Sequence, residues 1–488
     1  MLTDTADGST RPSFWPRVRE FAVPPSMIET ATARRLAGDW AGACAAAGID
    51  VDLHPRSAAR THGRELAGRL RSDLRHLAPD LLRWHMPRIA PDGLLRPGLT
   101  FTLARYDRAD GEGPVHLVAR TPPAWADAGQ RIGLGLWAGS RDEPGARRHP
   151  HPHPDPRFRL DLHRHLWDAR RTGELPTRSG TGLPPRGLDP RGLAPPGVDP
   201  AGPVPAGPVP AGLVPAGLVP AGLVPAGHRC AVDRWAAEAA TLLDAEGCST
   251  RAVTVRLGSR RRLLLELVGE GDGRPPAARI SPAAAGSGLP GAPVLPDAAT
   301  WVLPDLDLLR TGAIEPARLH PLVASALVPD HVPSGPSRVP DRAGRPHLVE
   351  CRGSRHRIGL VDGVLAPLDH DPAEIRREEL LVALTGTPLP CLQAIDAAHR
   401  RPDCLAGVRE RLDHGDTVGA LAVVERLLGP DALLRDGALR DELEAAARRR
   451  ITYGLYRAEL TGPRPRPRPG DLLPGVRPPR ERRSHPRR

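Results

Sequence analysis

Apolar residues recur at helical spacing in the first part of the chain, and the pattern then changes to that of strands. A helix is expected over about residues 27–47, and a second helical stretch follows it with one buried stripe. The stripe consists of Leu66, Leu70, Leu74, Leu77, Leu81 and Trp84. Pro79 is expected to kink or split this helix. Residues 99–106 and 115–120 have the pattern of a β-hairpin, and residues 131–137 that of a third strand.

A five-residue repeat interrupts the chain at residues 200–227. It reads PAGPV-PAGPV-PAGLV-PAGLV-PAGLV-PAG and resembles elastin-like repeats in composition. Proline at every fifth position removes a backbone donor and fixes φ, so neither a helix nor a sheet ladder can run through it. The alternative to a spacer is a Pro-rich ligand of an SH3-like domain. The P-x-x-x-x-P spacing of the repeat differs from the P-x-x-P that such domains bind. Because a structureless stretch of this length does not sit inside a compact domain, we predict a disordered Pro/Gly/Ala-rich linker at residues 173–229.

Beyond the linker the pattern predicts β-hairpins followed by helices. A helix at 232–243 precedes a hairpin of strands 253–257 and 263–268, and a second hairpin has strands 348–351 and 358–361. Further helices are expected at residues 371–386, 391–400, 403–413, 417–428 and 437–459.

These elements predict an α+β protein of two domains with a mainly helical C-terminal third. The domains are an α+β unit at residues 1–172 and a unit of hairpins and helical bundle at residues 230–462. Each is long enough to bury a core of its own. Residues 463–488 form an Arg/Pro tail that we expect to be disordered.

The chain contains no Lys and no Asn, and all 68 of its basic residues are Arg. This usage is typical of a GC-rich, actinobacterial-type genome, so a high Arg count alone says little about function. The missing Lys excludes P-loop nucleoside triphosphatases, protein kinases and pyridoxal-phosphate enzymes, because each of these needs a lysine in its site.

The net charge of +11 is concentrated in the tail. Residues 463–488 hold nine Arg and two acids, which leaves the body of the protein at about +4. So small an excess is not typical of a nucleic-acid-binding domain. The tail itself could hold nucleic acid, anionic lipid or an acidic protein weakly.

The six cysteines are too sparse for a disulfide framework in a chain of this length. The first fifteen residues have no cationic start followed by an apolar run, so no secretory signal is expected. No stretch approaches the eighteen apolar residues of a transmembrane helix. We therefore predict a cytoplasmic protein without a membrane association.

Two predicted hairpin turns share the sequence G-S-R-x-R. The first carries Arg260, Arg261 and Arg262, and the second carries Arg355 and Arg357. Cations crowded into a tight turn repel one another unless an anion lies between them. These arginines are our candidate contact for phosphate or nucleic acid. The alternative is a pair of solvated turns in an Arg-biased chain.

No complete catalytic or metal-binding motif is present. Nucleophile elbows, H-E-x-x-H, Walker and C-x-x-C sequences are all missing. Cys391, His399, Cys404 and His414 have the chemistry of zinc ligands, but their spacing fits no structural zinc pattern. We therefore predict no catalytic residue, no metal and no cofactor.

Two weaker motifs lie in the N-terminal part. Gly133, Gly135 and Ala138 match G-x-G-x-x-A, but a loop rather than a helix is expected to follow, so the glycines more often mark a close contact than a dinucleotide site. The H-P-H-P-H-P segment at residues 149–154 is expected to be extended and exposed, and to bind divalent metal only adventitiously.

The sequence G-D-x-x-G-A-x-A occurs twice, at residues 38–45 and 415–422, each time between two helical segments. Asp39 in the first motif, and Thr417 or Asp416 in the second, can cap the following helix, and small residues let the helices pack closely. The motif resembles the turn of a tetratricopeptide helix pair, although the 34-residue period of that family is not found. The resemblance implies that these helix pairs contact protein.

Three functions follow as hypotheses. The first is a non-enzymatic protein-interaction or accessory protein, with another protein as the partner. The second is a nucleic-acid-associated protein that uses the Arg-rich turns and tail. The third is an enzyme with an unrecognised site.

Overall fold

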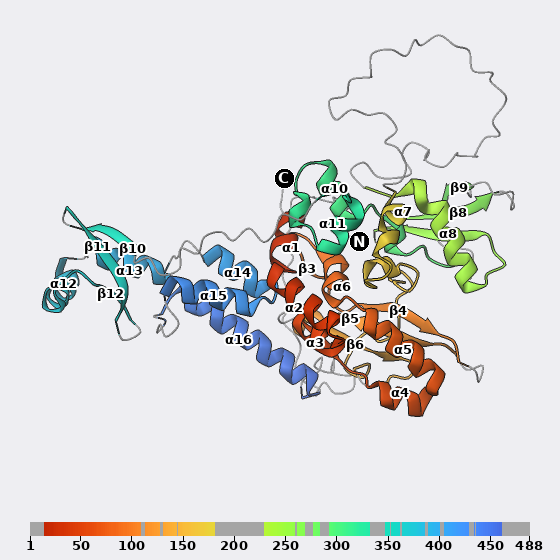
Figure 1. Ribbon diagram of the computed structural model, residues 1–488, viewed down its shortest axis with the longest axis horizontal. Helices are drawn as coiled ribbons and strands as arrows, with labels where there is room; N and C mark the ends of the chain where they lie inside the picture. The colour runs from red at the N-terminus through yellow and green to blue at the C-terminus, as the bar shows by residue number, and fades with distance from the viewer. Residues whose placement is uncertain are drawn as a thin grey trace, which may run out of the picture.

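The structure, a computed structural model, describes residues 14–460 apart from a long central stretch and several loops. The residues left out of that range are 109–112, 127–129, 144, 181–228, 259–260, 269–276, 284–291, 332–346, 352, 362–363, 386–388, 401–404, 429–433 and 435. Most of the predicted linker and the whole of the predicted tail therefore lie outside the described residues. The described chain is a mixed α+β fold with a helical C-terminal part, as predicted (Figure 1).

The N-terminal part is a four-stranded sheet covered on one face by helices. The strands are β1 (Ile49–Val51), β4 (Thr100–Tyr106), β5 (Val115–Arg120) and β6 (Ile132–Trp137), in the order β1-β6-β5-β4. β4, β5 and β6 are antiparallel neighbours, whereas β1 is parallel to β6 at the edge. The three strands predicted from the sequence are confirmed. The three-residue β1 was missed, since so short a strand leaves no periodicity to detect.

Six helices precede or flank this sheet. They are α1 (Trp15–Phe21), α2 (Pro25–Leu36), α3 (Trp40–Ala46), α4 (Pro55–His62), α5 (Arg64–His76) and α6 (Pro79–His85). The predicted apolar stripe runs along α5 and α6 and is buried throughout. The chain breaks between the two helices at the predicted position, because α6 begins at Pro79. A short hairpin of β2 (Arg88–Ile89) and β3 (Leu94–Leu95) follows.

The chain after the central gap returns to the N-terminal core. α8 (Val232–Glu246) packs on a second sheet of β7 (Ala252–Leu257), β8 (Arg261–Val268) and β9 (Ala277–Pro282), with α9 (Asp297–Thr300) beside it. The next helices, α10 (Pro304–Arg310) and α11 (Pro321–Leu327), bury their apolar residues in the same core as α1 and α6. The sequence pattern did not indicate that α10 and α11 would pack in the N-terminal core. The proposed domain boundaries stay a prediction.

Two buried polar contacts hold α10 and α11 in that core. The Arg19 guanidinium of α1 contacts the Asp305 carboxylate at 2.8 Å, and the Trp84 indole N–H donates to the same carboxylate at 3.2 Å. His320, just before α11, contacts Asp80 at 3.0 Å. A buried charged side chain is stable only with a partner. These contacts therefore favour the docking of α10 and α11, and not of another segment, against α1 and α6.

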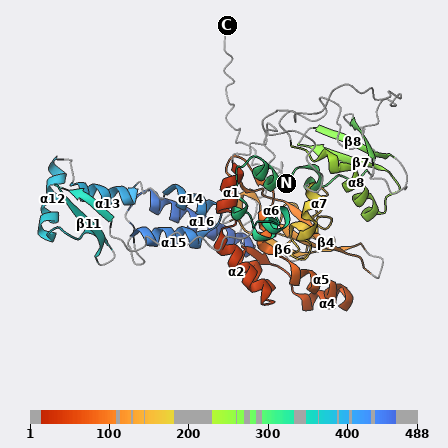
Figure 2. The ribbon, with the colours of Figure 1, turned by 45° about the horizontal axis from the view of Figure 1, so that its top comes forward.

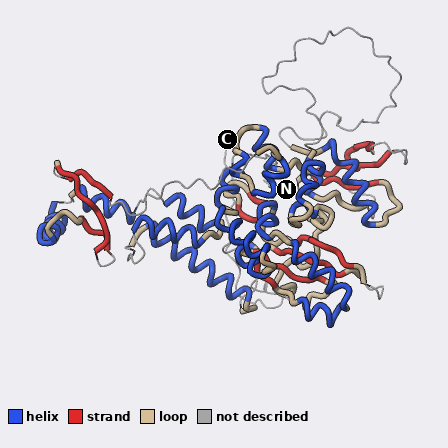
Figure 3. The backbone as a smooth tube through the Cα atoms, in the orientation of Figure 1, coloured by secondary structure: helices blue, strands red, loops and turns tan. Residues whose placement is uncertain are grey.

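The third region extends away from the body in Figures 1 and 2. It contains a sheet of β10 (His347–Cys351), β11 (Ser354–Val361) and β12 (Val364–Pro367), followed by α12 (Pro372–Thr385) and α13 (Pro390–Arg400). It continues with α14 (Leu405–Asp413), α15 (Thr417–Leu428) and α16 (Ala438–Arg457). Figure 3 shows how helices dominate between this small sheet and the body. Among the described helices, none combines the length and the apolar character needed to cross a bilayer.

The two G-D-x-x-G-A-x-A motifs form turns of the same construction between α2 and α3 and between α14 and α15. Gly38 and Gly415 have φ of +80° and +85°, which favours glycine. Asp39 and Asp416 each accept a hydrogen bond from the N–H three residues later, at 2.8 and 2.9 Å. The predicted helix caps are therefore confirmed. The implied contact with another protein stays a prediction.

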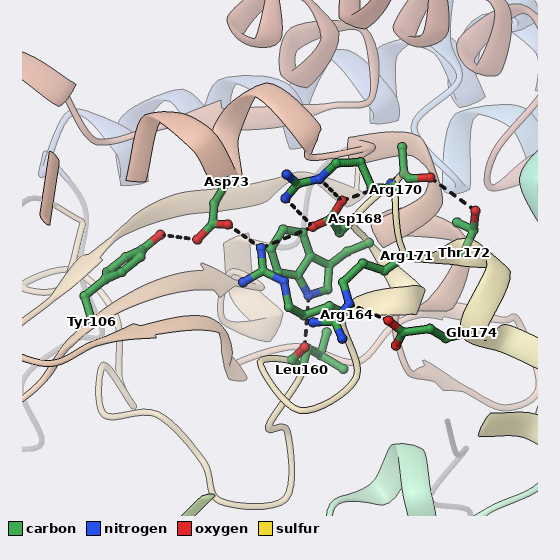
Figure 4. Close-up of polar contacts among 11 residues, drawn as sticks. Asp73, Tyr106, Leu160, Arg164, Asp168, Arg170, Arg171, Thr172 and Glu174 are labelled. Carbon is green, nitrogen blue, oxygen red and sulfur yellow. Dashed lines mark hydrogen bonds and ion pairs between the residues drawn. The ribbon is translucent and has the colours of Figure 1, made fainter. Parts of the chain in front are cut away.

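A complete polar network ties the segment after β6 to α5 and β4 (Figure 4). The Tyr106 hydroxyl donates to Asp73 at 2.8 Å, and Arg164 bridges Asp73 and the fully buried Asp168. Arg170 also contacts Asp168, at 3.1 Å. Because both carboxylates are satisfied by protein partners, we assign this network to the stability of the fold. From here, η5 (Thr172–Glu174) and α7 (Leu175–Ser179) continue ordered structure past residue 173.

Arg83 joins the C-terminal helices to the body. Its side chain is fully buried and makes no ion pair with a carboxylate of the described residues. Instead it donates to the carbonyls of Ala22 and His414, both at 2.9 Å, and to that of Gln130. Ala22 ends α1 and His414 follows α14, so a cation lies at two helix C-termini, where the helix dipole favours it. Burial lowers the pKa of Arg83 to about 10, which leaves it charged at neutral pH.

Replacing Arg83 should therefore cost more than replacing an exposed arginine of the same region. We expect Arg83→Met to lower the free energy of unfolding by about 3 kcal/mol or more, because three buried carbonyls lose their donor. The matched control is Arg409→Met, which breaks an exposed pair with Glu442 and should cost less than about 1 kcal/mol. Urea denaturation measures both. Equal losses in the two variants would contradict the role given to Arg83.

The ends of the central stretch lie close together, so its length should matter little. A Cβ built on Gly180 would lie 3.3 Å from the Asp233 carboxylate. We expect deletion of residues 200–227 to leave both predicted domains folded and to raise the free energy of unfolding by only ~0.7 kcal/mol, the loop-closure entropy of 28 residues fewer. Calorimetry would measure the change. Loss of cooperative melting would show that the repeat belongs to the fold.

Candidate functional site

The structure separates the two predicted Arg-rich turns. Arg260 lies outside the described residues, and Arg261 and Arg262 are exposed at the start of β8. Arg355 and Arg357 are exposed on β11, at the opposite end of the molecule in Figures 1 and 2. The two turns therefore do not form one joint site. An anion contact at either turn stays a prediction.

Arg357 already has an anionic partner within the protein. Its guanidinium contacts the Asp369 carboxylate at 2.6 Å, and its backbone N–H donates to the same group at 2.7 Å. These bonds lower the pKa of Asp369 to about 2. An external anion at Arg357 would have to compete with this carboxylate, which makes the second turn the weaker of the two candidates.

A stronger set of cations lies where α16 covers the outer face of the N-terminal sheet. A cleft of about 290 Å³, its open mouth included, is present there. Its lining comes from the strand ends, the loop after β6 and the end of α16: Asp52, Arg120, Pro122, Gly133, Gly145, Arg148, Tyr453, Tyr456 and Arg457. We call this the arginine cleft. Three of its lining residues are cations and one is an acid.

Sheet register explains why the cleft opens at this place. Gly133 of β6 is paired with Arg120 of β5 on one side and with Asp50 of β1 on the other. Residues paired across neighbouring strands share a face, so a glycine between two charged side chains leaves a gap on that face. A Cβ at Gly133 would lie 3.6 Å from an Asp52 oxygen, so the first glycine of the G-x-G motif leaves space beside that carboxylate. A loop follows β6, as the sequence predicted.

Arg120 is the residue of the cleft that makes no ion pair among the described residues, and its guanidinium lies over the Trp137 ring at 6.0 Å from the centroid. Its side chain extends from the end of a buried strand and the residue is only 5% exposed. Its Nε and Nη2 atoms are buried without a hydrogen-bond partner. Burial lowers its pKa to about 10, while Glu143 and Asp52 act against this from a distance. A buried guanidinium in this state gains strongly from a nearby anion.

The other two arginines of the cleft are held by Asp52 and by each other. Arg457 contacts Asp52 at 2.6 Å, and Arg148 lies 3.5 Å from the same carboxylate. Arg148 also donates to the backbone carbonyl of Arg457 at 2.9 Å. Arg148 also lies 3.5 Å from Glu459. Asp52 thus contacts two guanidinium groups, and three cations and one acid line the cleft.

Neighbouring contacts position α16 over the cleft. The Tyr453 hydroxyl donates to Asp50, which Arg131 also contacts at 2.6 Å. The Tyr456 ring meets the Trp125 ring edge-on, with centroids 5.4 Å apart. Gly145 has φ of +76°, and a Cβ there would lie 2.7 Å from an Asp52 oxygen. Glycine at this position therefore lets the loop approach the carboxylate that orients the arginines.

His149 fastens the loop that carries Arg148. Its Nε2 atom is 2.8 Å from the Thr121 carbonyl, and the backbone N–H of His151 donates to its Nδ1 at 3.2 Å. The sequence predicted an exposed segment, and this is wrong for His149, Pro152 and Pro154, which are buried, whereas His151 and His153 are exposed. His149 is thus part of the support of the cleft.

The lining offers cations and phenol rings but no imidazole or thiol. Such a set can bind an oxyanion by charge-assisted hydrogen bonds, and it provides no nucleophile with an adjacent base. Sequence reasoning missed Arg120, Arg148 and Arg457 because the chain uses Arg throughout. One local signal was present, since Arg120 is a cation that ends an otherwise apolar strand.

The buried imidazole of His149 predicts a loss of stability in mild acid. Burial lowers its pKa to about 4 in the folded protein, while the unfolded chain takes up the proton near the usual 6.5. The unfolded state therefore binds more protons below pH 6.5, and this contribution to stability is lost as the pH falls toward 4. We expect His149→Gln to remove about 1 kcal/mol of the decrease in unfolding free energy between pH 6 and 5.

The pH dependence is measured by urea denaturation at each pH. The matched control is His151→Gln, which removes an exposed imidazole from the same segment and should leave the slope as in the parent protein. An unchanged slope in the His149 variant would argue against a neutral, buried imidazole.

The arginine cleft combines a buried unpaired guanidinium, two further arginines and glycines that leave space beside them. No protein-family model, curated protein or solved structure matches this chain. The chemistry of the cleft is therefore what supports a function for this protein.

Proposed function

We propose that this is a non-enzymatic accessory protein whose arginine cleft binds an oxyanion-bearing ligand. The observation that carries the proposal is Arg120, a buried guanidinium with two nitrogen atoms that lack an acceptor. A phosphate or carboxylate group would supply those acceptors and balance the charge. Arg148 and Arg457 line the same cleft and would add positive charge beside that group, while both keep their contact with Asp52.

The place of the cleft gives binding a mechanical consequence. Its lining combines the N-terminal sheet with the last turn of α16, so a ligand would contact both. An anion bound there would strengthen the attachment of α16 to the sheet. We infer that the ligand stabilises the position of the C-terminal helices, from which a partner protein could detect it.

A protein partner is the second candidate, favoured by apolar side chains exposed on the C-terminal helices. Val418 of α15 is 80% exposed and Ile451 of α16 is 63% exposed. α16 is otherwise rich in charge, whereas α15 is mostly apolar. Exposed apolar side chains on these helices are candidates for contact with another protein. Nucleic acid remains the alternative partner through the tail. It requires binding that weakens steeply with salt.

The five described cysteines are free thiols. Free thiols are typical of proteins kept in a reducing compartment. On this ground we propose a cytoplasmic location.

Titration with inorganic phosphate tests the proposed function. We expect the protein to bind phosphate at low ionic strength, and Arg120→Met to weaken the binding at least tenfold, since each charge-assisted bond contributes about 1.5–3 kcal/mol. Isothermal titration calorimetry measures both, and acetate in place of phosphate distinguishes a carboxylate site. Because the substitution removes a buried cation that makes no ion pair among the described residues, the variant should stay folded.

The matched control is Arg147→Met, next to the cleft in sequence. Arg147 is exposed and pairs with Asp142 at 3.1 Å. We expect this variant to bind phosphate as the parent does. Absence of binding to either anion, or equal weakening in the two variants, would overturn the proposal.

A further inference from the structure

Three potential metal ligands converge in the small unit formed by β10–β12, α12 and α13. Cys351 ends β10, His370 lies between β12 and α12, and Cys391 is in the first turn of α13. Their ligand atoms all lie within 4.8 Å of one another. Spacings of 19 and 21 residues are too long for the short ligand pairs that mark zinc sites in a sequence, so only the fold brings this set together.

The geometry is close to that of a tetrahedral site. The Cys391 Sγ atom is 3.6 Å from the His370 Nε2 atom. Zinc binds sulfur at about 2.3 Å and nitrogen at about 2.0–2.1 Å, so two such ligands at a tetrahedral angle lie about 3.6 Å apart. Both cysteines are free thiols in the structure, and both are fully buried. Two thiols and an imidazole are a ligand set that selects zinc among the common divalent cations.

A carboxylate lies beside the imidazole nitrogen that does not face the thiols. The His370 Nδ1 atom lies 3.5 Å from Glu374, one turn into α12. A histidine that ligates a metal commonly donates its other N–H to a carboxylate, which fixes the ring and leaves Nε2 free for the metal. His356 stacks on His370 with ring centroids 4.1 Å apart and an angle of 11°. The imidazole is thus oriented on two sides.

The apolar core of this unit contains the two cysteines. Among the described residues, its buried cluster consists of Cys351, Leu389 and Cys391, with Val349, Ile375 and Leu392 partly buried around them, and Ile358 and Ile395 are buried as well. Small units commonly depend on a metal or disulfides for part of their stability. The two cysteines are the centre of this cluster, so a metal there would join the sheet to both helices.

We propose that Cys351, His370 and Cys391 bind one zinc ion that fastens β10–β12 to α12 and α13. The fourth position of the ion is left to water or to a further side chain. The ligands are almost closed off from solvent, since the His370 side chain is only 4% exposed. Burial of all three ligands favours a structural role, because a catalytic zinc needs a position that substrate can reach. This proposal is independent of the arginine cleft.

Metal analysis of the full-length protein tests the zinc site. We expect one equivalent of zinc, removed by a chelator and restored by added Zn²⁺. Cobalt in its place should give thiolate-to-metal charge-transfer absorption. Cys391→Ser should lose the zinc, and Glu374→Gln should weaken zinc binding about 10–100-fold. The control Cys248→Ser removes a free thiol elsewhere in the fold and should keep one equivalent.

The parent chain supplies a test that does not depend on variants. The zinc-loaded protein should have two fewer thiols that react with a thiol reagent than the chelator-treated protein has. Less than half an equivalent of zinc after reconstitution, cobalt without charge-transfer absorption, or a Cys351–Cys391 disulfide in the purified protein would each overturn the proposal. So would equal zinc content in Cys391→Ser and Cys248→Ser.

Discussion

The arrangement of the molecule depends on one buried cation that makes no ion pair among the described residues. Arg83 satisfies its guanidinium with the carbonyls of Ala22, Gln130 and His414. These carbonyls belong to the end of α1, the segment that leads into β6 and the end of α14. Helix C-termini carry partial negative charge, so the backbone itself replaces the missing carboxylate. The same side chain thereby positions the sheet and the C-terminal helices that together line the arginine cleft.

The cleft follows from that docking together with the register of the sheet. α16 covers the face of the sheet on which Asp50, Gly133 and Arg120 lie in one row. Tyr453 of α16 is anchored on Asp50, and Arg457 on Asp52. Among the described residues, Arg120 is left without an ion-pair partner because the position opposite it is a glycine. A chain without lysine places its buried positive charge on guanidinium groups, which are planar and suited to oxyanions.

The body and the small C-terminal sheet are held in different ways. The body buries a large apolar core to which α1, α6, α10 and α11 all contribute, and Arg19–Asp305 completes it. The unit of β10–β12, α12 and α13 has a few buried residues, and two of these are cysteines beside a histidine. Apolar burial accounts for the stability of the body. In the small C-terminal unit, the proposed zinc ion would add metal–ligand bonds that join the sheet to the helices.

The sequence by itself determined the local structure: the apolar stripe of α5 and α6, the break at Pro79, the strands β4–β6 and the two Asp-capped turns. Each of these depends on residues a few positions apart, where periodicity, capping and proline act directly. Only the tertiary structure decided that α10 and α11 complete the N-terminal core, that Arg120 faces Gly133, and that Cys351, His370 and Cys391 meet. These pairings depend on sheet register and on the docking of segments far apart in sequence, and the spacing of residue types carries no record of either.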